Sequence, residues 1–295
     1  MKVPPSFNEN QIDALISLID DPDELVYDQV KHQIVSLGEP IIPRLEAYWE
    51  QDTFGNLFQV RIEDIIHEIQ FSSVRLALKS WHDNGGEDLL EGLLILNRYQ
   101  YPDLEELEVR DQISRLRQDI WLELNDHLTA FEQVKVINEV LFGMHGFRGN
   151  KRNYHSAQNS FLSQVLETKK GNPLLLSMLY LILADSLDIP IHGINLPHHF
   201  ILAYEDRFNI FGNPESDKPE VLFYINPFSK GALLDKSEIK RFLKHVKLDP
   251  EDRFFEPCSN RVMLLRNIHN LMFSYQHSGE TDKLKEMKVL AEIFQ

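Results

Sequence analysis

Apolar residues recur at helical spacing through the start of the chain. From Ile12 to Ile19 they fall three or four residues apart, the spacing that places side chains on one face of an α-helix. The same spacing continues from Asp23 to Leu37, where Gly38 supplies a typical helix C-terminus, and a further apolar segment runs from Ile41 to Trp49. The pattern predicts three short helices in succession.

Short turns separate these predicted helices. Asp20-Asp21-Pro22-Asp23 follows the first helix, and Gly38-Glu39-Pro40 follows the second. This order resembles HEAT-type repeats, and we expect a second, poorer copy from Asn56 to Trp81. Because solenoid repeats bury their faces only by stacking, one or two copies would have to lean on the domain that follows. A plain helical bundle is the alternative interpretation.

A polar segment from His82 to Gly86 marks the boundary between two parts of the chain. We expect a helical module over residues 1–85 and a second domain over residues 86–295. The segment 143–156 of this domain is rich in glycine, asparagine and basic side chains, and we expect it to be a loop that overhangs a pocket. Helical spacing precedes that loop over residues 89–99, 104–128 and 131–142.

An apolar run and three strand patterns occupy the middle of the second domain. The run from Leu174 to Leu187 predicts a helix, and a turn-rich connection, Gly212 to Pro219, lies between the last two strand patterns. We expect a small antiparallel sheet that packs on this helix. The strand patterns cover residues 191–196, 200–204 and 221–225.

Helical spacing returns after the strands. Gly279 separates the last two helical patterns and predicts a helical hairpin, so that the C-terminal helical part extends over about residues 236–295. The predicted fold class is therefore α+β and mostly helical. The three helical patterns cover residues 236–246, 260–277 and 281–294.

The charge balance and the single cysteine limit the possible partners and compartments. The chain has 46 acidic and 30 basic side chains, and residues 1–100 alone hold 18 acidic and 7 basic ones. Because binding to a phosphate backbone needs clustered lysine and arginine, we expect no nucleic-acid partner. No apolar run approaches the length of a membrane span, the N-terminus lacks the apolar stretch of a signal peptide, and one cysteine gives no disulfide framework. We expect a cytoplasmic protein with no membrane partner.

The start of the apolar run has the composition of a helix N-terminus. The side chain of Asn172 can accept one of the free N–H groups, and Pro173 suits the first helical turn through its fixed φ and missing N–H. His198 and His199 follow at the start of a predicted strand, and Asn226 closes a later one. A helix start, a histidine on a strand and a polar residue closing another strand form the arrangement of papain-like and transglutaminase-like sites.

The order and spacing of these motifs resemble the transglutaminase-core family typified by the SirB group of bacterial proteins, a branch of the transglutaminase-like superfamily. The resemblance extends from about Asp88 to the C-terminus and is specific only when its motifs are taken in order. They are Gly146–Asn150, Tyr154, Asn159–Leu162, Val165–Glu167, Gly171–Pro173, Pro197–Phe200, Ile225–Phe228 with Gly231, and Arg261–Asn267.

The resemblance implies roles for three positions. In active members of the superfamily, a cysteine at a helix N-terminus acts with a histidine and an aspartate. The nucleophile position falls on Pro173, the base on His199 and the orienting acid on Asn226. Asparagine can still orient a histidine, but proline has no nucleophilic atom. The resemblance therefore implies a catalytically inactive domain.

Two other residues could supply a nucleophile. Cys258 lies beyond Asn226 in chain order, and we interpret it as a structural cysteine. Ser177 lies four residues after Pro173, and a mid-helix serine more often bonds the carbonyl one turn back. A residual hydrolase or amidase, with Ser177 as nucleophile and His199 as base, is the alternative function.

The adjacent histidines do not predict a metal site. Neighbouring side chains on a strand point to opposite faces, so His198 and His199 cannot bind one ion together, and no cysteine or carboxylate cluster accompanies them. We expect no metal and no cofactor. Instead, we expect His199 to be a partly buried ring that is hydrogen-bonded to Asn226.

The function that we predict is binding of a peptide or protein partner through the former substrate cleft, without acyl transfer. A third interpretation is a scaffold whose helical repeat does the binding. The residues that we expect to line the cleft are Gly171, Asn172, Tyr180, His198, His199, Asn226 and Phe228.

Overall fold

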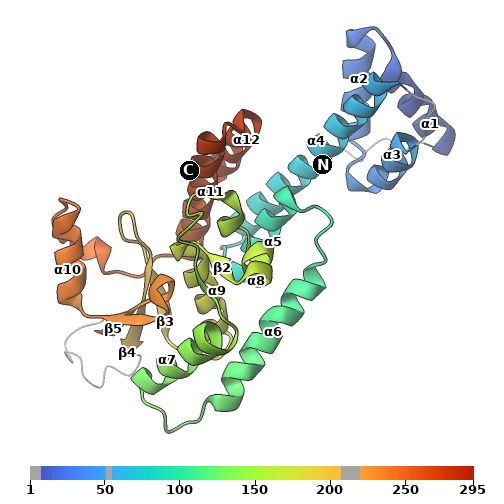
Figure 1. Cartoon of the computed structure of the whole chain (residues 1–295). Helices are drawn as coiled ribbons and strands as arrows, with labels where there is room; N and C mark the ends of the chain where they lie inside the picture. The colour runs from blue at the N-terminus through green and yellow to red at the C-terminus, as the bar shows by residue number, and fades with distance from the viewer. Residues whose placement is uncertain (1–7, 51–54, 207–219) are drawn as a thin grey trace. The chain divides into compact units, whose positions relative to one another are not determined.

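The computed structural model describes residues 8–50, 55–206 and 220–295 of the chain (Figure 1). The chain forms two compact units: residues 1–80 with 98–102 make up the first, and residues 81–97 with 103–295 the second. The turn-rich connection expected from Gly212 to Pro219 lies outside the described residues.

Helices make up the described part of the first unit. Asn8 caps the first helix through a reciprocal pair of hydrogen bonds with Gln11, and Asp23 caps the second. Apolar side chains from all of these helices, among them Ile16, Leu45 and Ile62, meet in one core. The helices are α1 (Glu9–Ser17), α2 (Glu24–Val35), α3 (Ile42–Trp49) and most of α4 (Asn56–Asp83).

A buried arginine holds the turn between α1 and α2. Arg61 of α4 is 5% exposed, and its Nη1 donates hydrogen bonds to the carbonyls of Ile19 and Asp21, both at 2.8 Å. Its Nη2 donates to the Glu24 carboxylate at 2.8 Å, and the guanidinium lies 4.0 Å from the centre of the Tyr27 ring. The cation therefore satisfies carbonyls that the turn leaves without helical partners.

The segment Asn56–Asp83 is one continuous helix. We expected a second, poorer repeat copy from Asn56 to Trp81, and this prediction is wrong, because a repeat of this type needs helices joined by a turn. The 28 residues of α4 include neither glycine nor proline, so no residue of the segment stops the helix.

The second unit combines helices with a small sheet. Its helices are α5 (Leu89–Gln100, up to Asn97), α6 (Glu106–Glu123), α7 (Ala130–Asn138), α8 (Leu162–Thr168), α9 (Pro173–Asp185), α10 (Lys236–His245), α11 (Asn260–Ser278) and α12 (Thr281–Ala291). Its strands are β1 (Arg148–Gly149), β2 (Lys170–Gly171), β3 (Ile191–Ile194), β4 (Ile201–Asp206), β5 (Glu220–Asn226) and β6 (Ala232–Leu234).

The sheet of the second unit is antiparallel in the order β3-β4-β5-β6. Leu202 of β4 pairs with Ile225 of β5, and Tyr224 of β5 pairs with Leu234 of β6. The small antiparallel sheet is therefore confirmed, but β6 was not predicted. The segment expected to be a loop also contributes β1, which pairs in parallel with β2.

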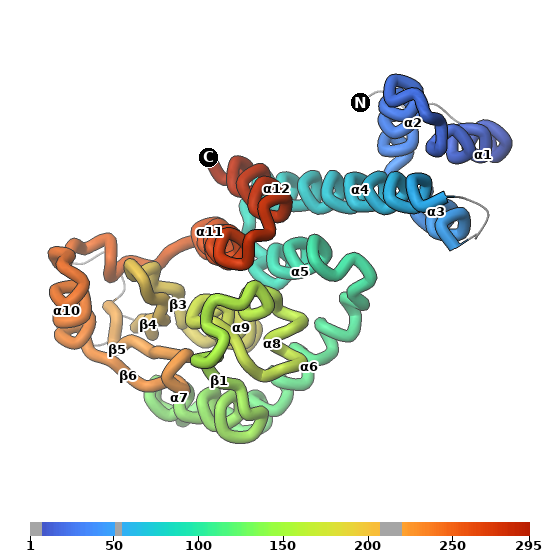
Figure 2. The backbone as a smooth tube through the Cα atoms, turned by 45° about the horizontal axis from the view of Figure 1, so that its top comes forward, coloured from blue at the N-terminus to red at the C-terminus, as the bar shows by residue number. Residues whose placement is uncertain are grey.

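The apolar helix α9 lies at the centre of the second unit (Figure 2). Every residue from Pro173 to Ala184 is buried, so no face of this helix meets water. A helix that is apolar on all sides has to be covered on all sides. The covering elements include β3, β4, α8 and α11, as expected for a helix on which the sheet packs.

The chain ends in a helical hairpin, as its spacing predicted. Gly279 ends α11 with φ +80°, a left-handed conformation that glycine adopts without steric cost. The helices α11 and α12 then pack against each other. The helix α11 also contacts α9, and it contributes residues to the pocket described next.

Candidate functional site

The N-terminus of α9 is fixed by Asn172. Its Oδ1 accepts a hydrogen bond from the Leu175 N–H at 2.8 Å, and its Nδ2 donates to the Ser160 hydroxyl at 2.9 Å. Asn172 is 7% exposed, and Pro173 occupies the first helical position. The predicted cap and helix start are confirmed.

The segment before α8 is tied down by a second asparagine. Asn159 Nδ2 donates to the carbonyls of Asn153 and Tyr154, at 2.6 and 3.0 Å, and its Oδ1 accepts from Asn150 Nδ2 at 2.8 Å. In addition, Asn267 of α11 donates to the Ser160 carbonyl at 2.9 Å. These bonds fix the backbone that carries Tyr154 at the mouth of the site.

The turn between β3 and β4 carries the two histidines. His198 has φ +59°, and the His199 N–H donates to the Leu196 carbonyl at 3.3 Å. We expected His199 on a strand, but it lies in this turn, two residues before β4 begins. The left-handed residue at His198 reverses the chain there, so neighbouring side chains do not alternate between two sheet faces.

Arg266 of α11 anchors the same turn. Its Nη1 donates to the Leu196 carbonyl at 2.7 Å and to the Asn195 side-chain oxygen. Its guanidinium lies 5.5 Å from the centre of the Phe200 ring. The position of the histidine turn is thus set by a residue about seventy positions later in the chain.

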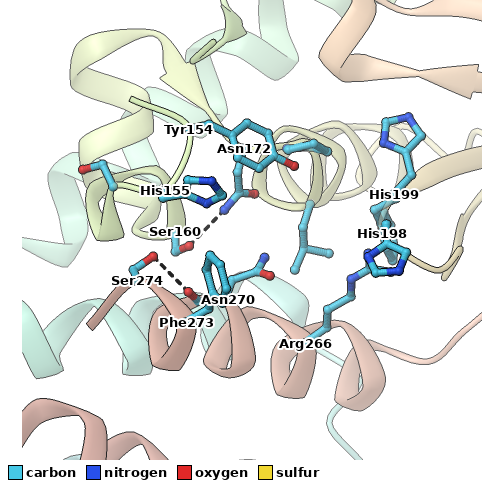
Figure 3. Close-up of a pocket in the computed structure, with 14 residues that line it drawn as sticks. Tyr154, His155, Ser160, Asn172, His198, His199, Arg266, Asn270, Phe273 and Ser274 are labelled. Atoms are coloured by element: carbon cyan, nitrogen blue, oxygen red, sulfur yellow. Dashed lines mark hydrogen bonds between the residues drawn. The ribbon is translucent and has the colours of Figure 1, made fainter. Parts of the chain in front are cut away.

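These elements enclose a pocket of about 370 Å³ (Figure 3). Tyr154, His155 and Phe273 lie at one end of the pocket, and His198, His199 and Arg266 lie at the other. The start of α9 lies between the two ends. The full lining consists of Tyr154, His155, Ser156, Ser160, Asn172, Pro173, Leu174, His198, His199, Phe200, Arg266, Asn270, Phe273 and Ser274.

His199 is held as a neutral ring. Burial lowers its pKa, and the positive charge of Arg266 lowers the pKa further. The ring also lies 5.9 Å from the Phe242 ring, centre to centre. An imidazole whose pKa lies below its ordinary value of 6.5 is neutral at pH 7 and can accept a proton or a hydrogen bond.

The three positions that the resemblance assigned to catalysis are only partly brought together. Pro173 and His199 line the same pocket, whereas Asn226 is not part of its lining. The Asn226 side chain accepts a hydrogen bond from the Ser229 N–H at 3.3 Å. Within the described part of the chain, no hydrogen bond joins Asn226 to His199, so the bond that we expected between them is not found.

The seven residues that we expected to line a cleft divide in the same way. Asn172, His198 and His199 line the pocket. Tyr180 is fully buried and stacks on Phe142, with ring centres 6.5 Å apart. The other three residues outside the pocket lining are Gly171, Asn226 and Phe228.

Phe228 supports the pocket from outside. Its ring meets the Tyr154 ring edge to face, with centres 5.9 Å apart. It also covers Gly149 so closely that a Cβ on that residue would lie 2.4 Å from the Phe228 Cε2 atom. Phe228 therefore positions Tyr154 without reaching the pocket itself.

Neither alternative nucleophile reaches the pocket. Ser177 is fully buried and donates its hydroxyl to the Pro173 carbonyl at 2.8 Å, the contact expected of a mid-helix serine. Burial raises the pKa of the Cys258 thiol to about 11, and neither residue belongs to the pocket lining. Their chemistry is that of structural residues.

Sequence reasoning did not identify the part of the pocket wall that α11 supplies. Arg266 lies in a motif that the resemblance quoted, but no role was assigned to it. The signal that could have found it is a single arginine on the face of α11 that packs toward α9. The pocket residues that we did not list as site candidates from α11 are Arg266, Asn270, Phe273 and Ser274.

Two searches of the described residues gave no site. Over residues 8–50, 55–206 and 220–295, no group of three or more histidine, cysteine, aspartate or glutamate side chains could hold a metal ion. Over the same ranges, no helix is both long and apolar enough to span a bilayer.

Comparisons with known proteins show which proteins the chain is similar to. A family model described as the transglutaminase-like superfamily matches residues 107–269, more than half of the chain. A UPF0162 protein of Xylella fastidiosa is 27% identical over 206 residues, which are 66% of this chain and 67% of that protein. F-box only protein 21 of Mus musculus is 34% identical over 116 residues, which are 37% of this chain and 17% of that protein. No solved structure matches the chain.

Proposed function

We propose that this chain, which belongs to the transglutaminase-like superfamily, is a catalytically inactive member that binds a peptide segment of a protein partner. The binding site is the pocket at the N-terminus of α9. The ligand lies between the loop that carries Tyr154 and the turn that carries His199, in the place where a substrate would lie in an active relative.

The residue at position 173 carries this proposal. Covalent acyl transfer needs a nucleophilic atom at the mouth of the helix, in reach of a base. Here the mouth of α9 is formed by Pro173, which lines the pocket together with His199 and has no atom that can attack a carbonyl. The neighbouring hydroxyl of Ser177 is buried and engaged by the Pro173 carbonyl.

The rest of the pocket supports binding. Aromatic rings and hydrogen-bonding groups both line a cavity of about 370 Å³, a size that accommodates one or two residues of a peptide. Tyr154 and Phe273 are 42% and 46% exposed, so their rings are open to contact. Rings with an accessible face are the side chains that contribute most to recognition of a partner.

Three finer assignments belong to the same proposal. Within the superfamily, we assign the chain to the SirB group on the order of its motifs, and we interpret the first unit as a HEAT-like module on its turn sequences. We also assign the protein to the cytoplasm, because its sequence has one cysteine and so no disulfide framework.

Selection from a library of random peptides tests the proposal. We expect the full chain to enrich peptides that bind it reversibly, and we expect the Asn270→Trp variant to lose them. Asn270 lines the pocket, so the larger side chain fills the cavity. The control is His269→Trp, because His269 is exposed and does not line the pocket.

The same protein preparation tests the lack of catalysis. Glutamine-containing peptides and a primary amine are incubated with the full chain, and ammonia release and amine incorporation are measured. We expect neither above the level of buffer. Turnover that disappears in His199→Ala would contradict the inactive assignment, and peptides that bind Asn270→Trp as well as the wild type would contradict the assigned pocket.

A further inference from the structure

The geometry points to an anionic group, a carboxylate or a phosphate, as the part of the peptide that this pocket holds. This inference rests on the proposed function and names the chemistry that the pocket selects. The peptide's anion lies beside Arg266, and an apolar side chain next to it packs on the rings of Tyr154 and Phe273.

The charge of the pocket lining differs from that of the protein as a whole. The chain has a formal net charge of −16. Among the described residues that line the pocket, none is acidic, whereas Arg266 is a cation and three histidines accompany it. A charge distribution that departs so far from the average of the chain is what recognition of an anion requires.

Arg266 has unused hydrogen-bonding capacity. Its Nη1 is engaged by the Asn195 side chain and the Leu196 carbonyl. Within the described part of the chain, no hydrogen bond uses its Nε or Nη2, and no carboxylate forms an ion pair with it. The guanidinium presents its donors as a planar fork, which matches the two oxygens of a carboxylate or phosphate.

Arg61, whose role is structural alone, provides a comparison for the charge partners of Arg266. Arg61 is also withdrawn from water, but its Nη2 is paired with the Glu24 carboxylate at 2.8 Å. Arg266 is partly buried without such a partner, and burial lowers its pKa. An anionic ligand would supply the missing counter-charge and offset the cost of withdrawing the guanidinium from water.

The start of α9 leaves a second donor beside the pocket. Pro173 has no N–H, the Leu175 N–H donates to the Asn172 side chain, and the Leu176 N–H donates to the Asn172 carbonyl. Leu174 lines the pocket, and its N–H has no partner among the described residues. The helix dipole makes this free N–H a favourable contact for negative charge, in support of Arg266.

The aromatic end of the pocket favours a ligand that carries an apolar group next to its anion. The His155 ring packs against two rings of α11, 5.1 Å from Phe273 and 5.5 Å from His277, centre to centre. Tyr154 lies 5.2 Å from His155. Because this aromatic end and Arg266 lie at opposite ends of one pocket (Figure 3), a ligand that fills it carries both an apolar group and an anion.

Small probes test this inference before the partner is identified. The Leu174 amide and the rings of His198 and His199 are followed by NMR in the isotope-labelled full chain. The probes are N-acetylphenylalanine, its neutral primary amide, the amide of N-acetylphosphoserine, and inorganic phosphate. We expect saturable shifts at these positions with the anionic probes, and binding of the neutral amide weaker by about tenfold or more.

The identity of the binding probe separates the two sources of negative charge. Saturation by N-acetylphenylalanine alone assigns a carboxylate, and saturation by the two phosphate probes alone assigns a phosphate. Equal binding of the neutral amide, or no shift with any anionic probe, overturns the inference. Displacement of bound phosphate by a single-stranded oligonucleotide that binds more tightly would also overturn it, because the anion would then come from nucleic acid.

A charge introduced into the pocket provides the matched variants. Asn270→Asp keeps the shape of the side chain but adds a carboxylate to the lining, and we expect it to weaken the anionic probes by at least about tenfold. His269→Asp adds a carboxylate at the adjacent exposed position and should leave binding unchanged. Arg266→Gln should abolish binding, and Asn270→Asp decides the question where Arg266→Gln does not fold.

The outcome is distinguishable from failure of the proposed function. Selected peptides that occupy the pocket but show no preference for aspartate, glutamate, phosphoserine or a free C-terminus would leave the proposed function standing and refute the anion. If the anionic probes bind but the library yields no peptide, the anion site would stand and the proposed peptide binding would be refuted.

Discussion

The hydroxyl of Ser177 donates a hydrogen bond of 2.8 Å to the carbonyl of Pro173, and both residues are buried. This contact joins the position to which the resemblance assigns the nucleophile to a hydroxyl one turn further along the same helix. Because the serine donates its proton to the backbone, its oxygen is directed along α9 and not into the pocket. This hydrogen bond therefore gives Ser177 a structural role at the start of α9.

Loss of the helix cap should be measurable in the stability of the protein. Asn172→Ala removes the acceptor for the Leu175 N–H and the donor to the Ser160 hydroxyl. We expect the free energy of unfolding to fall by about 1 to 2 kcal/mol, the upper range for a capping residue that is buried. Urea denaturation of the full chain provides the measurement.

Asn172→Asp is the matched control for that experiment. It retains the acceptor oxygen and replaces the donor to Ser160 with a carboxylate oxygen, whose charge the helix N-terminus favours, so most of the stability should remain. If Asn172→Ala unfolds at the same urea concentration as the wild type, the capping bond contributes nothing and the argument for the helix start fails.

The start of α9 could be predicted because its rules are local. The acceptor of Asn172, the fixed φ of Pro173 and the back-bond of Ser177 depend on residues within one helical turn. The apolar spacing likewise predicted the helices of the C-terminal hairpin. The continuity of α4 could also have been predicted locally, because its segment has no glycine or proline to stop a helix. We expected a repeat there because the preceding turns resemble those of HEAT-type repeats.

The rest of the site depends on contacts between distant segments. No local pattern indicates that Arg266 bonds the Leu196 carbonyl or that Asn267 bonds the Ser160 carbonyl. His199 was assigned to a strand because the apolar pattern of β4 begins nearby, but the left-handed His198 ends that regularity. The expected bond from His199 to Asn226 failed because Asn226 instead caps the turn that follows β5.

Gly149 should not tolerate a side chain. A Cβ at this position would lie 2.4 Å from the Phe228 Cε2 atom, so the aromatic ring would have to move. We expect Gly149→Ala to lower the free energy of unfolding by about 1 to 3 kcal/mol, the range for an overpacked interior contact. The double variant Gly149→Ala/Phe228→Leu should recover part of this loss, and additive effects of the two changes in urea denaturation would argue against a direct clash.

The stability of the second unit should depend on the protonation of His199. Burial and Arg266 lower its pKa below the ordinary 6.5, so between these two values the unfolded chain binds more protons than the folded chain. The stabilisation from the neutral ring is therefore complete above about pH 6.5 and is lost as the pH falls toward the folded pKa. His199→Gln should flatten the decline in stability between pH 7 and pH 5, as measured by chemical denaturation.

Direct titration of the ring checks the cause of that decline. The His199 signals followed by NMR should report a pKa below 6.5, and Arg266→Lys should keep the pKa low because the positive charge remains. A titration midpoint at or above 6.5 would show that neither burial nor the guanidinium acts on the ring.

A thiol placed at the mouth of α9 tests whether His199 can act as a base for position 173. Pro173→Cys puts the sulfur at a helix N-terminus, where the dipole lowers a thiol pKa, in a pocket that His199 lines as a neutral base. Cys258 serves as the internal reference, because burial raises the pKa of its thiol to about 11. We expect iodoacetamide to alkylate the new cysteine faster than Cys258 at pH 7, and we expect His199→Ala to remove much of that advantage.

Peptide mapping by mass spectrometry assigns each modified residue, with Pro173→Ser as the control that lacks a thiol at this position. If the new cysteine reacts no faster in the His199 background than in the His199→Ala background, the histidine no longer serves as a base for position 173. His199 would then be a binding residue alone, since nothing would remain of the pair that activates a nucleophile.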